Sequence, residues 1–258
     1  MNPRANLTSA IKQPWRRLRR FCRVLRGRDL WCRREIQLPT ERLGSEYGGW
    51  TLWPKALDAS SVVYSFGVGQ DISFDLAMIS QFGCTVHAFD PTPRSIDWVR
   101  RQALPGEFQF HEYGLGNIDG LVSFEPPADP THVSYSMSAP GNAPGKGESF
   151  PLRRLQSIAA ELGHDAIDLL KMDIEGAEYD AVEDLLQTGP RIGQILIEFH
   201  HRLRHEQLAR TRETIAGLRQ AGYLIFDVAP SGEEYSFVHE DALTPTHSNA
   251  YEQRTSFP

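Results

Sequence analysis

The chain has 258 residues, of which 40% are hydrophobic and 23% are charged. This composition excludes a disordered polymer and a collagen-like repeat, and the length suits one α/β domain with additions. No run of residues reaches the roughly 20 apolar positions that a transmembrane helix needs. Three cysteines without a CxxC pair exclude a disulfide-dense fold and indicate a reducing compartment such as the cytoplasm.

Charge is divided unevenly between the N-terminal segment and the rest of the chain. Residues 1–34 hold eleven Lys or Arg and one acid, Asp29, whereas the remainder holds 16 basic and 32 acidic residues. We therefore predict a basic N-terminal segment at 1–40, a globular domain at 41–245 and a loose tail at 246–258. Apolar residues of the basic segment recur at helical spacing and predict one stripe on a helix: Ile11, Trp15, Leu18, Cys22 and Leu25.

Three interpretations of this apolar stripe are open. The helix packs its stripe against the globular domain, or it lies on an anionic membrane surface, or its arginines bind nucleic acid. Packing is the simplest interpretation, and nucleic acid ranks last. The predicted location is the cytoplasm, with peripheral attachment to a membrane through residues 11–34 under the second interpretation.

From residue 61 onward, short apolar runs alternate with helix-length amphipathic stretches, which is typical of βα units around a parallel sheet. We predict a Rossmann-like, doubly wound α/β fold whose seven-stranded sheet has an antiparallel edge strand. The predicted helices are 71–82, 93–103, 151–163, 177–187 and 204–221. Residues 126–149 are rich in proline and glycine and are predicted to form a long loop that covers a substrate cleft. The predicted strands are 61–66, 84–89, 107–112, 167–172, 193–199, 222–228 and 235–239.

The ends of the first two predicted strands carry a nucleoside-binding pattern. Gly67 and Gly69 directly follow the first strand, where glycine lets the backbone approach a ligand closely. Asp90 follows the second strand, where a carboxylate accepts hydrogen bonds from both hydroxyls of a ribose. The alternative for Asp90 is a turn acid ahead of the helix that starts near Pro93.

The turn after the first strand distinguishes between two adenosine cofactors. A dinucleotide needs a third glycine at the start of the helix, and this chain carries Asp71 there. A carboxylate repels a pyrophosphate but tolerates a cationic ligand without phosphates, which favours S-adenosylmethionine over NAD. After the third strand, Glu112 is placed to accept from the adenine amino group and Tyr113 to stack on the ring, unless both are ordinary strand-end residues.

The segment LKMDIEGAE at 170–178 resembles the KxDxEGAE block of the FkbM-type S-adenosylmethionine-dependent methyltransferases. The resemblance covers about 60–240, and with the upstream GSEYGGW it is closer to the methyltransferase-like branch than to the sugar-modifying members. It implies O-methylation of a small-molecule or glycan hydroxyl. Ser65 stands where most members carry an acid, and Asp71 where they carry a second glycine. Ser65 can still hydrogen-bond the methionine part of the cofactor, and Asp71 or Asp75 can supply the missing carboxylate.

The expected chemistry is an in-line displacement, in which the enzyme aligns the nucleophile with the methyl carbon and the sulfur. An acceptor hydroxyl also has to lose a proton. The fourth and fifth predicted strands deliver Asp173, Glu175 and His200 to the carboxyl edge of the sheet. We predict that His200 is the general base and that the two acids orient substrate or cofactor. In the alternative, Glu175 and Glu178 only stabilise the start of the next helix.

Other functions are less favoured by the sequence. Asp173 with Glu198 or His200 would bind Mg²⁺ or Mn²⁺, but no dedicated metal-ligand spacing is present. A catalytically silent scaffold acting through the basic segment is suggested by Ser65 and Asp71. A nicotinamide-dependent oxidoreductase is disfavoured because the third glycine is missing.

Overall fold

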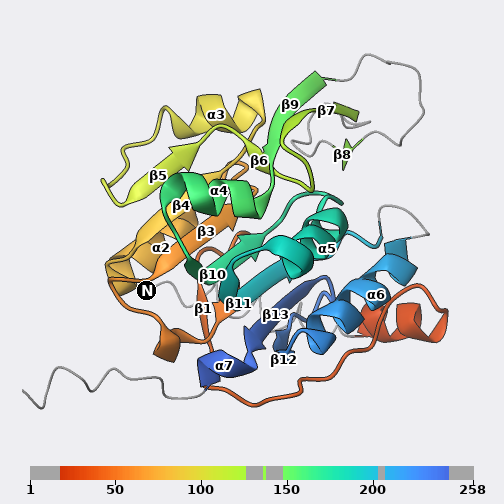
Figure 1. Ribbon diagram of the computed structural model, residues 1–258. Coiled ribbons are helices and arrows are strands. Elements are labelled where there is room, and N and C mark those ends of the chain that lie inside the picture. The colour runs from red at the N-terminus through yellow and green to blue at the C-terminus, as the bar shows by residue number, and fades with distance from the viewer. Residues whose placement is uncertain (1–17, 126–135, 138–147, 203–206, 244–258) are drawn as a thin grey trace, which may run out of the picture.

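The computed structural model describes residues 18–125, 136–137, 148–202 and 207–243 (Figure 1). Seven strands form the central sheet in the order β12-β13-β11-β10-β3-β4-β5, and β13 is antiparallel to both of its neighbours while the remaining pairs are parallel. This confirms the predicted Rossmann-like α/β sheet with antiparallel pairing at one edge. The strands are β3 (Val62–Phe66), β4 (Thr85–Phe89), β5 (Phe108–His111), β10 (Ala166–Met172), β11 (Arg191–Glu198), β12 (Tyr223–Val228) and β13 (Glu234–His239).

The central strands are apolar on both faces because both faces are covered. In β10, Leu170 and Met172 belong to one buried cluster, whereas Leu169 just before them belongs to the other. In β11, Leu196 and Ile197 likewise contribute to opposite clusters. Side chains alternate across a strand, so a continuous apolar run fills two cores at once and specifies a sheet buried on both sides.

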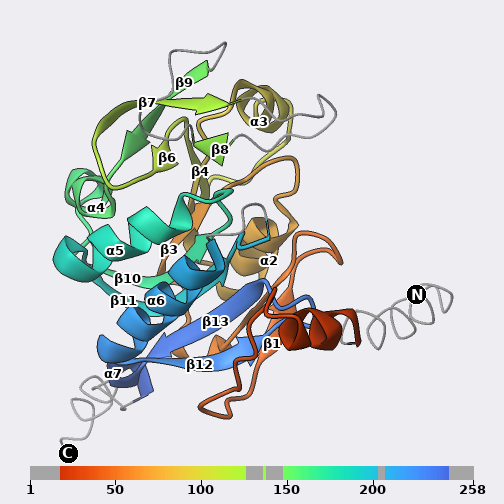
Figure 2. The ribbon, with the colours of Figure 1, turned by 90° about the vertical axis from the view of Figure 1, so that its right-hand side faces the viewer.

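Helices cover the two faces of the sheet. Figure 2 shows α4, α5 and α6 on one face and α2 on the other. All five predicted helices are present in the described residues, with ends that shift by a few positions. The helices are α2 (Ser73–Phe82), α3 (Pro93–Val99), α4 (Leu155–Leu162), α5 (Glu178–Thr188) and α6 (Gln207–Gln220), followed by a short α7 (Glu240–Leu243) and preceded by the 3₁₀ turn η1 (Pro54–Ala56).

Two smaller sheets were not predicted. The hairpin of β1 (Glu41–Leu43) and β2 (Trp50–Leu52) lies ahead of the central sheet in the chain. A four-stranded sheet has the order β6-β9-β7-β8, with β6 (Gly114–Leu115), β7 (Gly120–Glu125), β8 (Ser136–Met137) and β9 (Glu148–Arg153). The helix expected from residue 151 therefore begins only at Leu155. Most of the predicted loop at 126–149 lies outside the described residues.

The described part of the basic segment begins with a helix at 18–25 (Figure 2). Leu30 then joins the main buried cluster, and the amide of Glu35 donates a hydrogen bond to the carbonyl of Ile225 on β12. The boundary predicted at residue 40 is not tested by these contacts. Residues 1–17, which include Ile11 and Trp15, and the tail at 246–258 lie outside the described residues. Within the described chain, no helix combines the length and apolarity required to span a membrane.

Candidate active site

A cavity of about 400 Å³ opens where β3, β4 and β10 end. Its wall includes Gly67 and Gly69 after β3, Asp90 after β4, and Asp173 and Glu175 after β10. The chain order reverses between β3 and β10, since the segments after β3 build β4 and β5 while those after β10 build β11. A ligand of an open α/β sheet binds at such a switch point, beyond the carboxyl ends of the strands.

The glycine turn after β3 is supported by a buried lysine. Gly67 and Gly69 both have positive φ angles, +80° and +55°, which L side chains rarely adopt. The ammonium of Lys171 on β10 donates to the carbonyls of Phe66, at 3.0 Å, and Gly67, at 2.6 Å. These two bonds hold the turn in place from below. Sequence reasoning missed Lys171, although a lone lysine in the apolar run IDLLKM was a usable signal.

Asp90 forms the turn predicted by one of its two interpretations and also lines the cavity. Its Oδ2 accepts a hydrogen bond of 2.9 Å from the amide of Gly69, and its Oδ1 accepts from the amide and the hydroxyl of Thr92. A carboxylate offers about four lone-pair sites, so Oδ2 keeps one for a ligand. Asp90 thus shapes the turn before α3 and also faces the cavity.

Asp71 connects the cavity to the segment Gly44–Trp50. Its carboxylate accepts hydrogen bonds from the hydroxyl of Ser45, at 2.6 Å, and the amide of Ser73, at 2.9 Å. Burial opposes the charge on Asp71, but these bonds outweigh it and hold its pKa below the usual value. Trp50 is buried and Tyr47 is exposed, and both line the cavity. This segment therefore forms part of the cavity wall.

Several predicted residues do not line the cavity, and the predicted general base His200 is one of them. Ser65 and Asp75 are buried beneath it, where desolvation raises the pKa of the Asp75 carboxyl. Glu112 is exposed and forms an ion pair of 2.5 Å with Arg100. Tyr113 packs beside Phe89 and under the guanidinium of Arg153. The adjacent Gly114 and Leu115 line the cavity instead.

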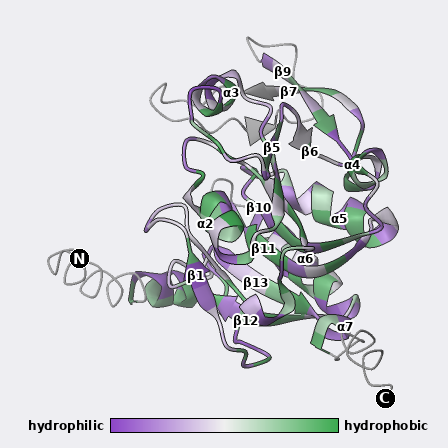
Figure 3. Ribbon diagram, turned by 90° about the vertical axis from the view of Figure 1, so that its left-hand side faces the viewer, coloured by the Kyte–Doolittle hydropathy of each residue, from purple (hydrophilic) through white to green (hydrophobic). Residues whose placement is uncertain are grey.

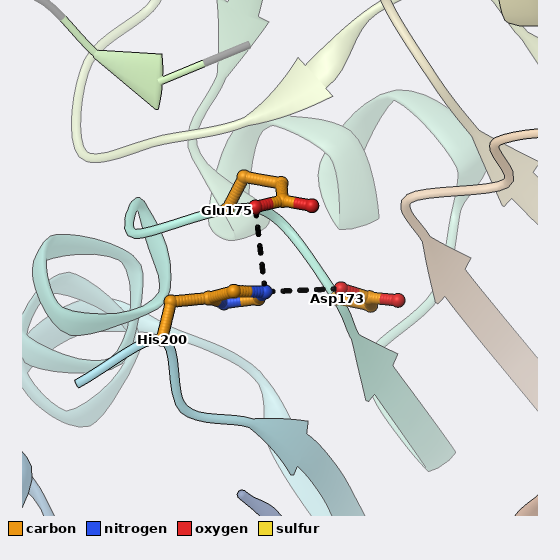
Figure 4. Close-up of side chains that lie close together, drawn as sticks. All are labelled: Asp173, Glu175 and His200. Carbon is orange, nitrogen blue, oxygen red and sulfur yellow. Dashed lines mark ion pairs between the residues drawn. The ribbon is translucent and has the colours of Figure 1, made fainter. Parts of the chain in front are cut away.

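Asp173, Glu175 and His200 come together at one side of the cavity (Figure 4). The Nε2 atom of His200 lies 3.5 Å from Oδ1 of Asp173 and 3.6 Å from Oε2 of Glu175. Burial disfavours the charged imidazole, but three neighbouring carboxylates outweigh burial and raise the pKa of His200 to about 10. In this arrangement the imidazole carries a proton at neutral pH. His201, the neighbouring residue, points elsewhere and pairs with Asp29.

A buried carboxylate orients this group. Glu178, the first residue of α5, has no exposed side-chain surface. Its Oε1 accepts from the amide of His200, at 2.8 Å, and its Oε2 accepts from the amide of Gly176, at 2.7 Å. Glu178 therefore links the loop after β10 to the loop after β11. At the end of β11, burial and the charge of Asp173 raise the pKa of Glu198 to about 8.

The small sheet contributes cavity residues that no sequence motif indicated. Phe150 and Leu152 of β9 line the cavity, as do Thr92 and Ser95 at the start of α3. The alternation of buried Phe150 and Leu152 with exposed Ser149 and Pro151 is the period of a strand. That alternation was the available signal, and the prolines and glycines nearby concealed it.

A parallel sheet with a glycine turn after β3, an acid after β4 and a cavity at the switch point defines a nucleoside-binding domain of the Rossmann-like class. Comparison with protein families identifies the family within this class: the model of the methyltransferase FkbM domain matches residues 61–225. The chain belongs to the FkbM methyltransferase family.

Individual relatives match only part of this chain, at modest sequence identity. The probable methyltransferase-like protein 24 of Rattus norvegicus is 31% identical over 140 residues, and that of Homo sapiens is 33% identical over 141 residues. Each match covers 54% of this chain and 32% of the relative, so the chain spans about a third of the length of these proteins. A crystal structure of methyltransferase FkbM from Methylobacillus flagellatus KT superposes with a TM-score of 0.44 at 15% identity, over 71% of this chain and 44% of that one.

Proposed function

We propose that the protein binds S-adenosylmethionine in the cavity between β3, β4 and β10 and transfers the methyl group to a hydroxyl of a small molecule or a glycan. One observation carries the proposal: the turn at Gly67 and Gly69, the carboxylate of Asp90 and the acids Asp173 and Glu175 all line a single cavity at the switch point. The residues proposed to bind the nucleoside and the acids Asp173 and Glu175 thus share one cavity.

The charge of the cavity supports a cationic cofactor. Three carboxylates besides Asp90 line the cavity, those of Asp71, Asp173 and Glu175. Lys171 is the one basic side chain among these described lining residues, and its ammonium is already bonded to two carbonyls. A pyrophosphate would find no free cation here, whereas the amino group and sulfonium of S-adenosylmethionine are positive.

The acidic side supplies the proton acceptor. Bound S-adenosylmethionine would supply the methyl group and keep the electron pair of its carbon–sulfur bond, and the proton of the acceptor hydroxyl would pass to a carboxylate. Asp173 and Glu175 line the cavity and are the groups available for this proton. His200 does not line the cavity but contacts both of these acids, so we assign it a positioning role, in place of the general base suggested by the sequence.

Calorimetry with S-adenosylmethionine tests cofactor binding, and mass spectrometry tests transfer. We expect binding at one site per chain and, with extracts as acceptors, a product heavier by one methyl group. Asp90→Asn should weaken binding about tenfold or more, because a charged hydrogen-bond acceptor is lost. Absence of heat and of a thermal shift at millimolar cofactor would refute the enzymatic function and support a scaffold role.

A further inference from the structure

We propose that Asp173, Glu175 and His200 form a site for a divalent cation of the Mg²⁺ or Mn²⁺ type, which presents the ion to the acceptor hydroxyl. This inference deepens the proposed function, on which its catalytic purpose rests. Two carboxylates and one neutral imidazole are ligands that such ions accept, and the ion would take the place of the proton on Nε2 of His200. No other group of His, Cys, Asp and Glu within the described residues brings three ligand atoms as close together.

The distances suit one ion. The three ligand atoms lie within 4.8 Å of one another, and Nε2 of His200 is 3.5 Å and 3.6 Å from the two carboxylate oxygens. An ion bound at about 2.1 Å places neighbouring ligand atoms about 3 Å apart, so the side chains need to close by only about half an ångström. Asp173 and Glu175 line the cavity, which leaves the remaining coordination positions toward the acceptor.

The surrounding residues orient the ligands. Oε1 of Glu178 lies 3.4 Å from Nδ1 of His200, so the carboxylate charge faces the imidazole although the two atoms form no hydrogen bond. Glu175 has a φ of +51°, the one positive value among the described residues other than glycine. This conformation costs about 1 kcal/mol or more, and such strain is found at functional sites. It is held by the bond from the Gly176 amide to Glu178.

Manganese binding tests this site without any turnover. Titration of the full chain with Mn²⁺ alone, followed by electron paramagnetic resonance, should give one bound ion per chain. Asp173→Asn and Glu175→Gln should each weaken binding at least tenfold, whereas Asp97→Asn, at an exposed acid on α3, should leave it unchanged. Thermal melting confirms that each variant is folded.

The outcomes separate the ion site from the cofactor site. Failure to bind Mn²⁺, or binding that survives both substitutions, overturns the ion site. Binding of S-adenosylmethionine is measured separately in the presence of a chelator. Bound Mn²⁺ with no bound cofactor would leave the ion site standing and refute the proposed function.

A different observation carries a second inference. On the helix at 18–25, the apolar residues Leu18, Phe21 and Leu25 are 55%, 49% and 71% exposed, and Trp31 beyond it is 58% exposed. Arg20 faces the domain instead: it is buried and donates to the carbonyls of Leu30, at 3.0 Å, and Ala229, at 3.4 Å. Of the predicted stripe, Leu18 and Leu25 are thus exposed while Cys22 is partly buried, so the packing interpretation does not hold for Leu18 and Leu25. Figure 3 shows hydrophobic and hydrophilic residues alternating along this helix, which lies beside β1.

We infer that the face formed by Leu18, Phe21, Leu25 and Trp31 docks on an anionic lipid surface. Asp29, the one acid of residues 18–34, is fully buried against His201 and Arg202. The exposed charges of 18–34 are therefore all positive, although Arg34 pairs with Asp227: Arg19, Arg26, Arg28, Arg33 and Arg34. Exposed apolar side chains on a segment whose other exposed side chains include several arginines match the boundary between acyl chains and anionic headgroups.

Lipid fits this face better than nucleic acid does. Arginine contacts to phosphates would use the charges but leave Phe21, Leu25 and Trp31 in water. Insertion to the depth of the acyl chains buries these side chains as well. Large apolar side chains that lie together on a protein surface usually mark a site of interaction.

Vesicle flotation tests the docking surface. The full chain should float with vesicles that contain phosphatidylserine and not with pure phosphatidylcholine vesicles. The double variant Phe21→Ser/Leu25→Ser should lose at least tenfold in bound fraction, whereas Ile118→Ser/Leu121→Ser, which changes two equally exposed apolar residues elsewhere, should bind as the natural chain does. Equal binding by both double variants, or binding to RNA that competes with the vesicles and ignores Phe21→Ser/Leu25→Ser, would overturn the inference.

Discussion

A Cβ atom placed on Gly67 would lie 1.7 Å from the carbonyl oxygen of Asp173. The backbones after β3 and β10 therefore touch at the switch point, and the amide of Asp173 in addition donates to the carbonyl of Phe66, at 3.1 Å. This contact brings the cofactor turn and the acidic side into one cavity. It also explains why a glycine is required there in terms of space as well as of φ.

Gly67→Ala should destabilise the fold strongly and abolish cofactor binding. The clash is with backbone, which cannot rotate away, and we expect a loss of about 3 kcal/mol or more in the free energy of unfolding. Gly163→Ala is the control, because Gly163 has a similar φ of +75° but no atom within 4 Å of an added Cβ. It should cost only about 1 kcal/mol. Urea denaturation measures both, and equal costs would contradict the role of the contact.

Asp90→Asn should affect ligand binding more than stability. The amide can still accept from Gly69 and Thr92, but it loses the charge that strengthens bonds to ribose hydroxyls. Calorimetry should show cofactor affinity reduced by about tenfold or more. Asp58→Asn serves as the control, since Asp58 makes a similar turn with Ser60 far from the cavity wall. If both variants bound cofactor equally, Asp90 would be only a turn residue.

Lys171 and Asp75 should be coupled energetically. Both side chains are buried, and Lys171 supplies the largest opposing charge to the carboxyl of Asp75, whose pKa burial raises. Lys171→Met should cost about 3 kcal/mol, because it leaves a buried acid without its cation. Adding Asp75→Asn should recover a large part of this loss. Denaturant unfolding of the two single variants and the double variant completes the cycle, and additive costs would show that the two groups do not interact.

Asp29 should make the free energy of unfolding depend on pH in the acidic range. Burial opposes its charge, but hydrogen bonds from His201, Arg202 and the Leu30 amide hold its pKa below the usual value. Because the folded pKa is lowered, the stabilisation is complete above the unfolded value of about 4 and is lost as the pH falls through the folded value. Urea denaturation of Asp29→Asn should show a smaller stability at pH 6 and a flatter decline below pH 4 than the natural chain. Asp97→Asn, at an exposed acid, should follow the natural curve.

The strands of the central sheet could be predicted because each carries its own signal. An apolar run such as LLKM on β10 fills a core on both faces, and that requirement is visible in the residues themselves. The sequence signal of β9 is weaker, because Phe150 and Leu152 alternate with polar or proline positions beside a long proline-rich stretch. The helix expected from residue 151 consequently started too early.

The candidate site was predictable only in part. Gly67, Asp90 and Asp173 follow strands directly, and the ends of parallel strands meet at one edge, so their proximity follows from the chain order. Tyr113 also follows a strand, yet its ring packs on Phe89 instead of lining the cavity. Which way a side chain turns after a strand depends on neighbours that are distant in sequence.

The sequence by itself determined the sheet, the order of the βα units, the glycine turn with its acid, and the position of the acidic block. These features arise from periodicity and from residues a few positions apart. Only the tertiary structure decided that Glu178 orients His200, that Lys171 holds the glycine turn, and that Leu18 and Leu25 face solvent. The physical reason is that burial and electrostatic environment are sums over residues from separate segments, and no local pattern contains them.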